Sequence, residues 1–405
     1  MGGSASACHG VRVVSWRLVR PSSNPGCVAA SPEPETVHLT PWDLQMLTID
    51  HIQKGVLLPK PPGPGGAGDE LVERLASSLA RALARFHPFA GRLAVEESGG
   101  SSGGDDDGTV TVSLRCTGDG AEFVHAVAAG VTVADVAGPL LVPRVVWSLF
   151  PLDGLVGADA AAGSRARPRL AAQVTELADG VFVAMSLNHA VADGTAFWHL
   201  FNTWSRISLS TGGERDESAI PVPPPVLERW FPDGCPVPVP LPFGKLEHIV
   251  RRFDGPPVEE CFLAFSAESV RELKARANAE AGGPAAISSL LSVLAHLWRG
   301  VTRARRLLRQ QETSYTVLVG CRGRVRRVPQ AYAGNAVVRC AARAAAGEVL
   351  GNGLGWAAAL LGRAVASLDE AALVGSAARW HRDPRFASIC LTCRAVQDRD
   401  EYVAR

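Results

Sequence analysis

A proline-rich stretch near the middle of the chain limits what the chain can fold into. Proline lacks a backbone N–H and fixes φ, so neither a helix interior nor a central strand can pass through such a stretch. Between residues 221 and 242 the prolines include Pro223, Pro224, Pro225, Pro232, Pro236, Pro238 and Pro240. The 405 residues also exceed what one ordinary core accommodates. We therefore expect two domains, residues 1–220 and 246–405, joined by a stiff extended linker at 221–245.

Strand-like and helix-like patterns alternate on both sides of this stretch. Apolar alternation and short apolar runs predict strands at 11–19, 109–114, 141–149, 171–177, 181–187, 314–320 and 336–341. Helical periodicity predicts helices at 69–86, 195–207, 267–281, 287–302 and 348–368. Ala178-Asp179-Gly180 is a hairpin signal between two of the strands. This alternation predicts the α/β class in both halves.

Composition argues against several classes of partner and site. Lys and Arg number 41 against 40 Asp and Glu, so nucleic acid or an anionic membrane surface is not expected as the main partner. No apolar run reaches the roughly 18 residues of a spanning helix, and residues 1–10 lack the apolar segment of a secretory signal. The 9 cysteines are scattered, which favours reduced thiols and a cytoplasmic protein. The CxxC pair Cys390 and Cys393 lacks a second ligand pair, so no metal site is expected.

The sharpest local feature is the segment His189-Ala190-Val191-Ala192-Asp193-Gly194, between an apolar strand and a helix. Imidazole accepts a proton near neutral pH, which suits a general base, and a strand-to-loop junction can present it to a cleft. A purely structural interpretation fits the same residues, with Asp193 capping the helix and His189 in the core. Spacing alone leaves both interpretations open. Zinc is disfavoured because the segment offers no third ligand.

This segment resembles the HxxxDG motif of the plant BAHD acyltransferases, a family of acyl-CoA-dependent enzymes. Four further stretches resemble other family motifs in the same order, so that the match runs from about residue 11 to residue 386. They are Leu39–Leu44 (L[ST]xxD), Phe86–Leu93 (YYPLAGRL), Ala295–Arg305 (AHVWRxxxRAR), and Gly320–Arg324 with Tyr332–Ala336 (xxRxR…YFGN). One HxxxD is a weak signal, but five ordered segments together are a strong one.

The resemblance implies two chloramphenicol acetyltransferase-like domains, each a mixed sheet with flanking helices, with an active-site tunnel at their interface. It implies that His189 is the general base. His189 would deprotonate the hydroxyl or amine of a small specialised metabolite as that group attacks the acyl-CoA thioester, with no acyl-enzyme. Asp193 would turn away from the tunnel and pair with Arg322, which would hold the loop, and Gly194 would allow close substrate approach. The family further implies a monomer with acyl-CoA as co-substrate and no permanently bound cofactor.

Four other residues are candidates for substrate contact. Ser288 and Ser289 begin a predicted helix, where their hydroxyl and N–H groups could meet a CoA phosphate or simply cap the helix. Thr40 and Trp42 are candidates for the tunnel lining, with a packing role as the alternative. The sequence leaves the acyl donor, the acceptor and the choice between ester and amide open.

The chain departs from the family pattern after Phe386. The DFGWG segment of the family is absent from the sequence. We therefore expect an incomplete C-terminal domain with unpaired residues after Phe386, and an alternative function as a catalytically impaired protein that binds acyl-CoA or acceptor. A relationship to peptide-synthetase condensation domains is disfavoured because Asn188 replaces the first histidine of their HHxxxDG motif.

Overall fold

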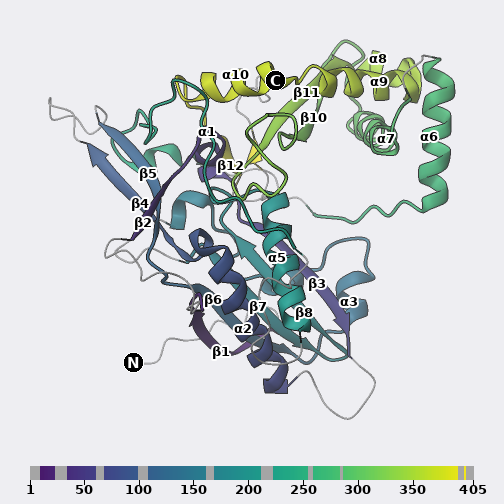
Figure 1. Cartoon of the computed structure of the whole chain (residues 1–405). Helices are drawn as coiled ribbons and strands as arrows, with labels where there is room; N and C mark the ends of the chain where they lie inside the picture. Colours follow the sequence, from purple (N-terminus) through teal and green to yellow (C-terminus); the bar gives the residue numbers. More distant parts are fainter. Residues whose placement is uncertain are drawn as a thin grey trace. The chain divides into compact units, whose positions relative to one another are not determined.

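The computed structural model describes residues 10–22, 34–60, 68–98, 108–160, 168–210, 222–253, 259–282, 286–390 and 396–397. The chain forms two compact units (Figure 1). Unit 1 comprises Met1–Phe262, Pro329–Asn335 and Ala377–Arg405, and unit 2 comprises Leu263–Val328 and Ala336–Ser376. These bounds do not coincide with the expected segments, because the chain returns to unit 1 twice after leaving it. The helices and strands found in each unit confirm the α/β class.

Unit 1 is built on a five-stranded mixed sheet in the order β1-β6-β7-β8-β3. Its strands are β1 (Arg12–Val19), β3 (Ile52–Pro59), β6 (Ala121–Ala128), β7 (Leu170–Leu177) and β8 (Gly180–Leu187). Neighbouring strands are antiparallel except β6 and β7, which are parallel. β7 and β8 form the hairpin that the sequence predicts. β8 is buried along its whole length, so the residues that follow it start from a rigid support.

Two amphipathic helices cover one face of this sheet, α2 (Gly68–Arg85) and α5 (Gly194–Leu209). They lie side by side in Figure 1, and the Trp204 indole of α5 donates to the Leu75 carbonyl of α2 at 2.9 Å. Val183 and Met185 of β8 belong to the core on this side. Phe182 and Ala184 alternate with them and belong to a smaller cluster on the other face.

The other face carries short elements where the sequence predicts a strand at 141–149. The structure shows α3 (Val133–Ala137), α4 (Val145–Ser148) and η3 (Gly157–Ala160), with a single β-bridge at Leu141. The predicted strand is wrong because Pro143 cannot donate to a ladder, and its carbonyl instead accepts from Val146 in the first turn of α4.

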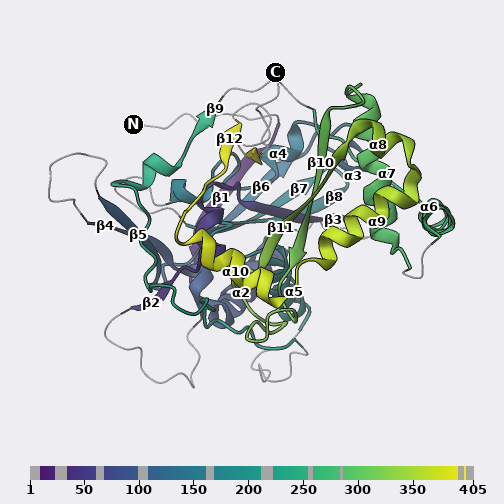
Figure 2. The same ribbon diagram turned by 90° about the horizontal axis from the view of Figure 1, so that it is seen from above.

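Two smaller sheets complete unit 1. One has the order β2-β5-β4, from Glu35–His38, Thr109–Cys116 and Arg92–Ser98. The other has the order β13-β12-β9, from Val396–Gln397, Ser388–Cys390 and Arg252–Phe253. Figure 2 shows β12 beside β9, with which it pairs in parallel. The expectation of unpaired residues after Phe386 is therefore wrong for β12 and β13, which have strand partners.

The proline-rich stretch packs within unit 1. Its described part, 222–245, contains neither helix nor strand, as the prolines predict. It is fixed by the bridges Val226–Tyr332 and Val110–Leu241. Trp230 is buried and stacks on Trp42 with the ring centroids 4.5 Å apart. Unit 1 also contains four short helical elements, which are α1 (Pro41–Leu44), η1 (Gln45–Thr48), η2 (His87–Ala90) and η5 (Leu246–Ile249).

Unit 2 contains an antiparallel pair, β10 (Glu312–Gly320) and β11 (Val337–Ala345), and four helices among its described residues. These are α6 (Ala267–Ala281), α7 (Ser289–Ala304), α8 (Ala346–Gly351) and α9 (Gly353–Ala366). The single helix predicted at 348–368 is wrong, because Gly353 adopts φ of +91° and separates α8 from α9. A further helix, α10 (Glu370–Trp380), runs from unit 2 into unit 1.

No helix in the part of the chain that the structure describes has both the length and the apolar character that crossing a membrane requires.

Candidate active site

The loop that carries His189 leaves the end of the buried strand β8. Asn188, which is buried, fixes the start of this loop with three hydrogen bonds. Its backbone N–H donates to the Arg169 carbonyl at 2.8 Å, and its side-chain amide donates to the Gly157 carbonyl at 2.8 Å. Its side-chain oxygen accepts from the Ala190 N–H at 2.9 Å. His189 itself remains partly exposed, so a side chain able to accept a proton stands on a rigid support.

Asp193 caps helix α5 at the other end of the loop. Its Oδ1 accepts from the N–H groups of Thr195 and Ala196, each at 3.0 Å, and the residue is 1% exposed. The capping role predicted for Asp193 is therefore confirmed. Gly194 begins the helix, and a Cβ atom at this position would meet nothing within 4 Å. Packing does not require glycine there, and its role in substrate approach stays a prediction.

Asn335 holds the backbone of His189 from a distant part of the sequence. Its side-chain amide donates to the His189 carbonyl at 2.8 Å and to Oδ1 of Asp43 at 2.9 Å. Its backbone N–H donates to the same carboxylate oxygen at 3.0 Å. Asn335 and Asp43 are both fully buried, so these bonds are shielded from water. The motif-like segments around both residues were visible in the sequence, but the contact between them was not predicted.

Arg229 of the proline-rich stretch completes this arrangement. Its Nη2 donates to the Val191 carbonyl at 2.9 Å, and its Nη1 lies 3.5 Å from Oδ1 of Asp43. Burial alone lowers the pKa of Arg229, but the Asp43 carboxylate leads the groups that outweigh it and keep the pKa above its ordinary value. The guanidinium is therefore charged, and it ties a second carbonyl of the His189 loop to the same aspartate. This role of Arg229 was not predicted from the sequence, because no local pattern marks it.

The electrostatics of His189 suit a proton acceptor. Burial lowers its pKa below the ordinary 6.5, against opposing effects from its own backbone carbonyl, from the Asp193 carboxylate and from the Asn335 side chain. The imidazole is therefore neutral at neutral pH, with a nitrogen lone pair available.

The other candidate residues have structural partners. Thr40 caps α1, where its hydroxyl and backbone N–H donate to Asp43, and Trp42 is buried against Trp230. Ser288 caps α7 by accepting from the Leu291 N–H at 3.2 Å, and Ser289 is exposed. Substrate contact by these four residues stays a prediction.

Arg322 lies in unit 2, on the connection between β10 and β11, and forms a bridge to Val325. Its pairing with Asp193 stays a prediction.

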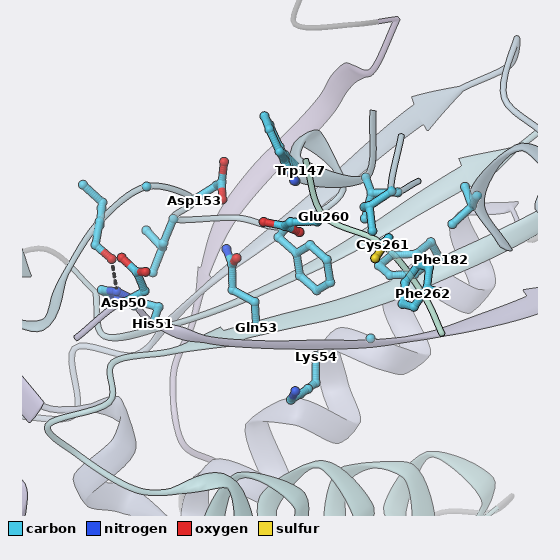
Figure 3. A pocket seen from close by; sticks show the side chains of 18 residues that line it. Asp50, His51, Gln53, Lys54, Trp147, Asp153, Phe182, Glu260, Cys261 and Phe262 are labelled. Atoms are coloured by element: carbon cyan, nitrogen blue, oxygen red, sulfur yellow. Dashed lines mark hydrogen bonds between the residues drawn. The ribbon is translucent and has the colours of Figure 1, made fainter. Parts of the chain in front are cut away.

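A cavity of about 740 Å³ opens on the face of the sheet opposite α2 and α5 (Figure 3). His51 lines it, immediately before β3, and Ile52 of β3 pairs with Leu187 at the end of β8. His51, directly before β3, and His189, two residues after the end of β8, therefore lie at the same end of these two antiparallel strands. Burial is the main cause that lowers the pKa of His51, and the charge of His189 adds to it. His51 was not predicted from the sequence, because its place at the cavity follows from the pairing of β3 with β8, which no local pattern encodes.

Within the described residues, Glu35, His87 and Cys116 bring potential metal-ligand atoms within 4.8 Å of one another. Nε2 of His87 already lies within hydrogen-bond distance, 2.8 Å, of a Glu35 carboxylate oxygen. Burial, followed by the charge of Glu35, raises the pKa of Cys116 to about 11, which keeps the thiol protonated and opposes metal binding. We assign no metal to this group.

Comparison with known proteins places these observations in context. The sequence model of the Transferase family matches residues 26–403. An uncharacterized acetyltransferase of Arabidopsis thaliana is 32% identical over 392 residues, covering 96% of this chain and 83% of the relative. The BAHD acyltransferase DCR of Arabidopsis thaliana is 30% identical, covering 89% and 74%. Agmatine coumaroyltransferase-1 of Hordeum vulgare is 30% identical, covering 73% and 63%.

Solved structures share the fold at low sequence identity. Vinorine synthase superimposes with a TM-score of 0.59 at 17% identity, covering 94% of this chain and 83% of that one. F. sporotrichioides TRI101, solved in complex with coenzyme A and T-2, gives a TM-score of 0.58 at 18% identity, covering 86% and 78%.

Proposed function

The chain belongs to the Transferase family, the BAHD acyltransferases, and from this premise we propose that it transfers an acyl group from acyl-CoA to the hydroxyl or amine of a small metabolite. The fold is that of the chloramphenicol acetyltransferase-like acyltransferases. Acyl-CoA as donor is supported by the related fold solved with coenzyme A, and acceptors of this kind by the agmatine coumaroyltransferase. We also propose that the chain acts as a monomer in the cytoplasm.

The observation that carries this proposal is the way the His189 loop is held. Three separate groups fix its backbone, namely Asn188 within the loop, Asn335 and Arg229, while the His189 side chain keeps a lowered pKa and partial exposure. Three side chains from separate parts of the sequence bond to the backbone of this one short loop and so hold it in a single conformation. The arrangement suits a base that must be neutral at physiological pH and keep one orientation.

The proposed mechanism follows from that geometry. His189 takes the proton of the acceptor as the acceptor oxygen or nitrogen attacks the thioester carbonyl carbon. The C–S bond of the resulting tetrahedral species then breaks, and the proton passes from His189 to the departing CoA thiolate. The loop lets His189 perform both transfers without rearranging. Asp193 fixes the start of α5, and its pairing with Arg322 remains part of the proposal.

The test is release of free CoA by the purified chain, with a panel of acyl-CoA donors and with alcohols and amines as acceptors. His189→Ala should lower the rate by about 10² to 10⁴, the usual range for a lost general base. His296→Ala is the matched control, since His296 is exposed on α7. A His189→Ala variant as active as wild type would exclude the mechanism. Binding of acyl-CoA without turnover by wild type would favour the alternative, an impaired binding protein.

A further inference from the structure

The balanced charge of the whole chain conceals a large difference between its two units. Unit 2 contains 15 Lys and Arg against 7 Asp and Glu, out of 41 and 40 in the whole chain. The remaining residues therefore include 26 basic and 33 acidic ones. An excess of basic residues in one part of a chain points to a polyanionic partner for that part. The overall composition therefore does not exclude such a partner for unit 2.

Four exposed arginines gather where helix α7 (Ser289–Ala304) ends. This arginine cluster consists of Arg303, Arg305, Arg306 and Arg309. Within the part of unit 2 that the structure describes, none of the four forms an ion pair, and the nearby Glu312 is paired with Arg343 at 3.1 Å. The dipole of a helix attracts cations only within its last turn, so it does not account for Arg306 and Arg309.

The backbone beneath the arginine cluster is held on both sides. Nε1 of Trp298 in α7 donates to Oγ1 of Thr313 in β10 at 3.2 Å. Beyond the helix, the Gly347 N–H of α8 donates to the Arg309 carbonyl at 2.8 Å, and Figure 2 shows α8 beside α7. The charges therefore stand on a fixed support, and binding does not have to order a loose segment first.

Exposed aliphatic side chains lie among these arginines. Val301 is 53% exposed and Leu308 is 65% exposed. Residues 301–311 contain no aromatic side chain, on which the bases of a single-stranded nucleic acid would stack. Basic and exposed aliphatic side chains in one short segment are typical of surfaces that lie in the headgroup region of an anionic membrane.

We propose that the arginine cluster, together with Val301 and Leu308, binds the surface of a membrane that carries anionic phospholipids. The guanidinium groups donate to the phosphate and carboxylate oxygens of the headgroups. The two aliphatic side chains reach the boundary between the headgroups and the acyl chains. Such binding is peripheral and reversible, and it requires neither a spanning helix nor the chemistry of His189.

Co-sedimentation of the full chain with lipid vesicles tests this inference. Vesicles of equal parts phosphatidylserine and phosphatidylcholine should bind the chain at least about tenfold more tightly than pure phosphatidylcholine, and salt should weaken this binding. A triple variant with three charges of the cluster removed should bind about tenfold to a hundredfold less tightly; it combines Arg305→Gln, Arg306→Gln and Arg309→Gln.

The matched control removes the same amount of charge from exposed positions elsewhere in unit 2. It combines Arg271→Gln, Lys274→Gln and Arg363→Gln, and it should bind within about threefold of wild type. All of these positions are exposed, so both variants should fold, which melting temperatures check. Leu308→Ser should also weaken binding to the vesicles, because it removes an apolar contact with the lipid.

Equal binding to the two kinds of vesicle, or equal losses in the cluster variant and the control, would overturn the inference. Two competitors identify other sources of phosphate. Tighter binding to poly(U) RNA than to the vesicles would assign the cluster to nucleic acid. Release from the vesicles by excess CoA at constant ionic strength would assign it to the phosphates of CoA. Either result would reject the membrane as partner.

Discussion

The surroundings of His189 shift its pKa in opposite directions. Burial favours the neutral imidazole, whereas its own carbonyl, Asp193 and Asn335 favour the charged one. Burial prevails, so the pKa lies below 6.5. A base of this kind is ready at neutral pH and still gains stabilisation from nearby dipoles when it takes a proton.

This balance predicts the pH dependence of turnover. The proton-accepting form of His189 exists above its pKa and is lost as the pH falls through it, so the acid limb of the rate should lie below 6.5. The measurement is kcat/KM for CoA release between about pH 5 and 8, because its pH dependence reports the groups of the free enzyme, with melting temperatures at each pH as the control for unfolding. An acid limb at or above 6.5 would show that a different group, or an unperturbed histidine, controls the rate.

Two substitutions of Asp193 test its capping of α5 separately from its charge. Asparagine can still accept from the N–H groups of Thr195 and Ala196, whereas alanine cannot. Asp193→Ala should therefore lose about 0.5 to 2 kcal/mol more stability than Asp193→Asn, measured by urea unfolding. Equal losses in the two variants would mean that charge, through the proposed pairing with Arg322, dominates over capping.

At the scale of elements, the loop between β8 and α5 is held by groups that lie far away in the sequence. Asp43 accepts from both nitrogens of Asn335, which donates in turn to the His189 carbonyl. Arg229 bonds to the Val191 carbonyl from the proline-rich stretch. The loop between strand β8 and helix α5 therefore keeps one arrangement, because the buried side chains of Asp43, Asn335 and Arg229 hold it together.

Asn335→Asp should disrupt this connection at almost constant volume. The new carboxylate would face the Asp43 carboxylate and the His189 carbonyl, neither of which can donate to it. We expect a loss of about 3 kcal/mol or more in the free energy of unfolding, together with a lower rate per folded molecule. Asn202→Asp, at an exposed position of α5, serves as control and should change stability by less than about 0.5 kcal/mol. Similar losses in the two variants would contradict the role assigned to Asn335.

Elements with strong local signals could be predicted from the sequence, and those defined by distant contacts could not. The helix at 267–281 and the β7–β8 hairpin follow from periodicity and turn residues. β6 was missed because it is buried on both faces and shows little alternation. His189 and the cap at Asp193 are local features and were found. Asn335, Arg229 and His51 act through contacts that no local pattern encodes.

At the scale of the whole molecule, the two units differ in how their sheets are covered. In unit 1, β7 and β8 have neighbours on both sides and packed clusters on both faces. In the described part of unit 2, β10 and β11 pair only with each other, and Leu318 of β10 is 65% exposed. Local opening is easier where fewer apolar contacts must be broken.

Hydrogen exchange followed by mass spectrometry should detect this difference. Ladder amides of β7 and β8 should exchange at least about tenfold more slowly than the ladder amides shared by β10 and β11. The comparison uses only amides that are paired within a ladder in each unit, so that exposure of unpaired N–H groups does not bias it. Equal protection in the two sheets would show that the units open together.

The partnership of Asp43 with Asn335 has a consequence for how the protein is made. The two residues are 292 positions apart. At a synthesis rate of roughly 5 to 20 residues per second, Asn335 is added about 15 to 60 s after Asp43. A nascent chain thus carries the complete His189 segment well before the residue that fastens it exists. Competence is acquired only after Asn335 has been added, and nascent chains that have not reached Asn335 present the histidine without its anchor.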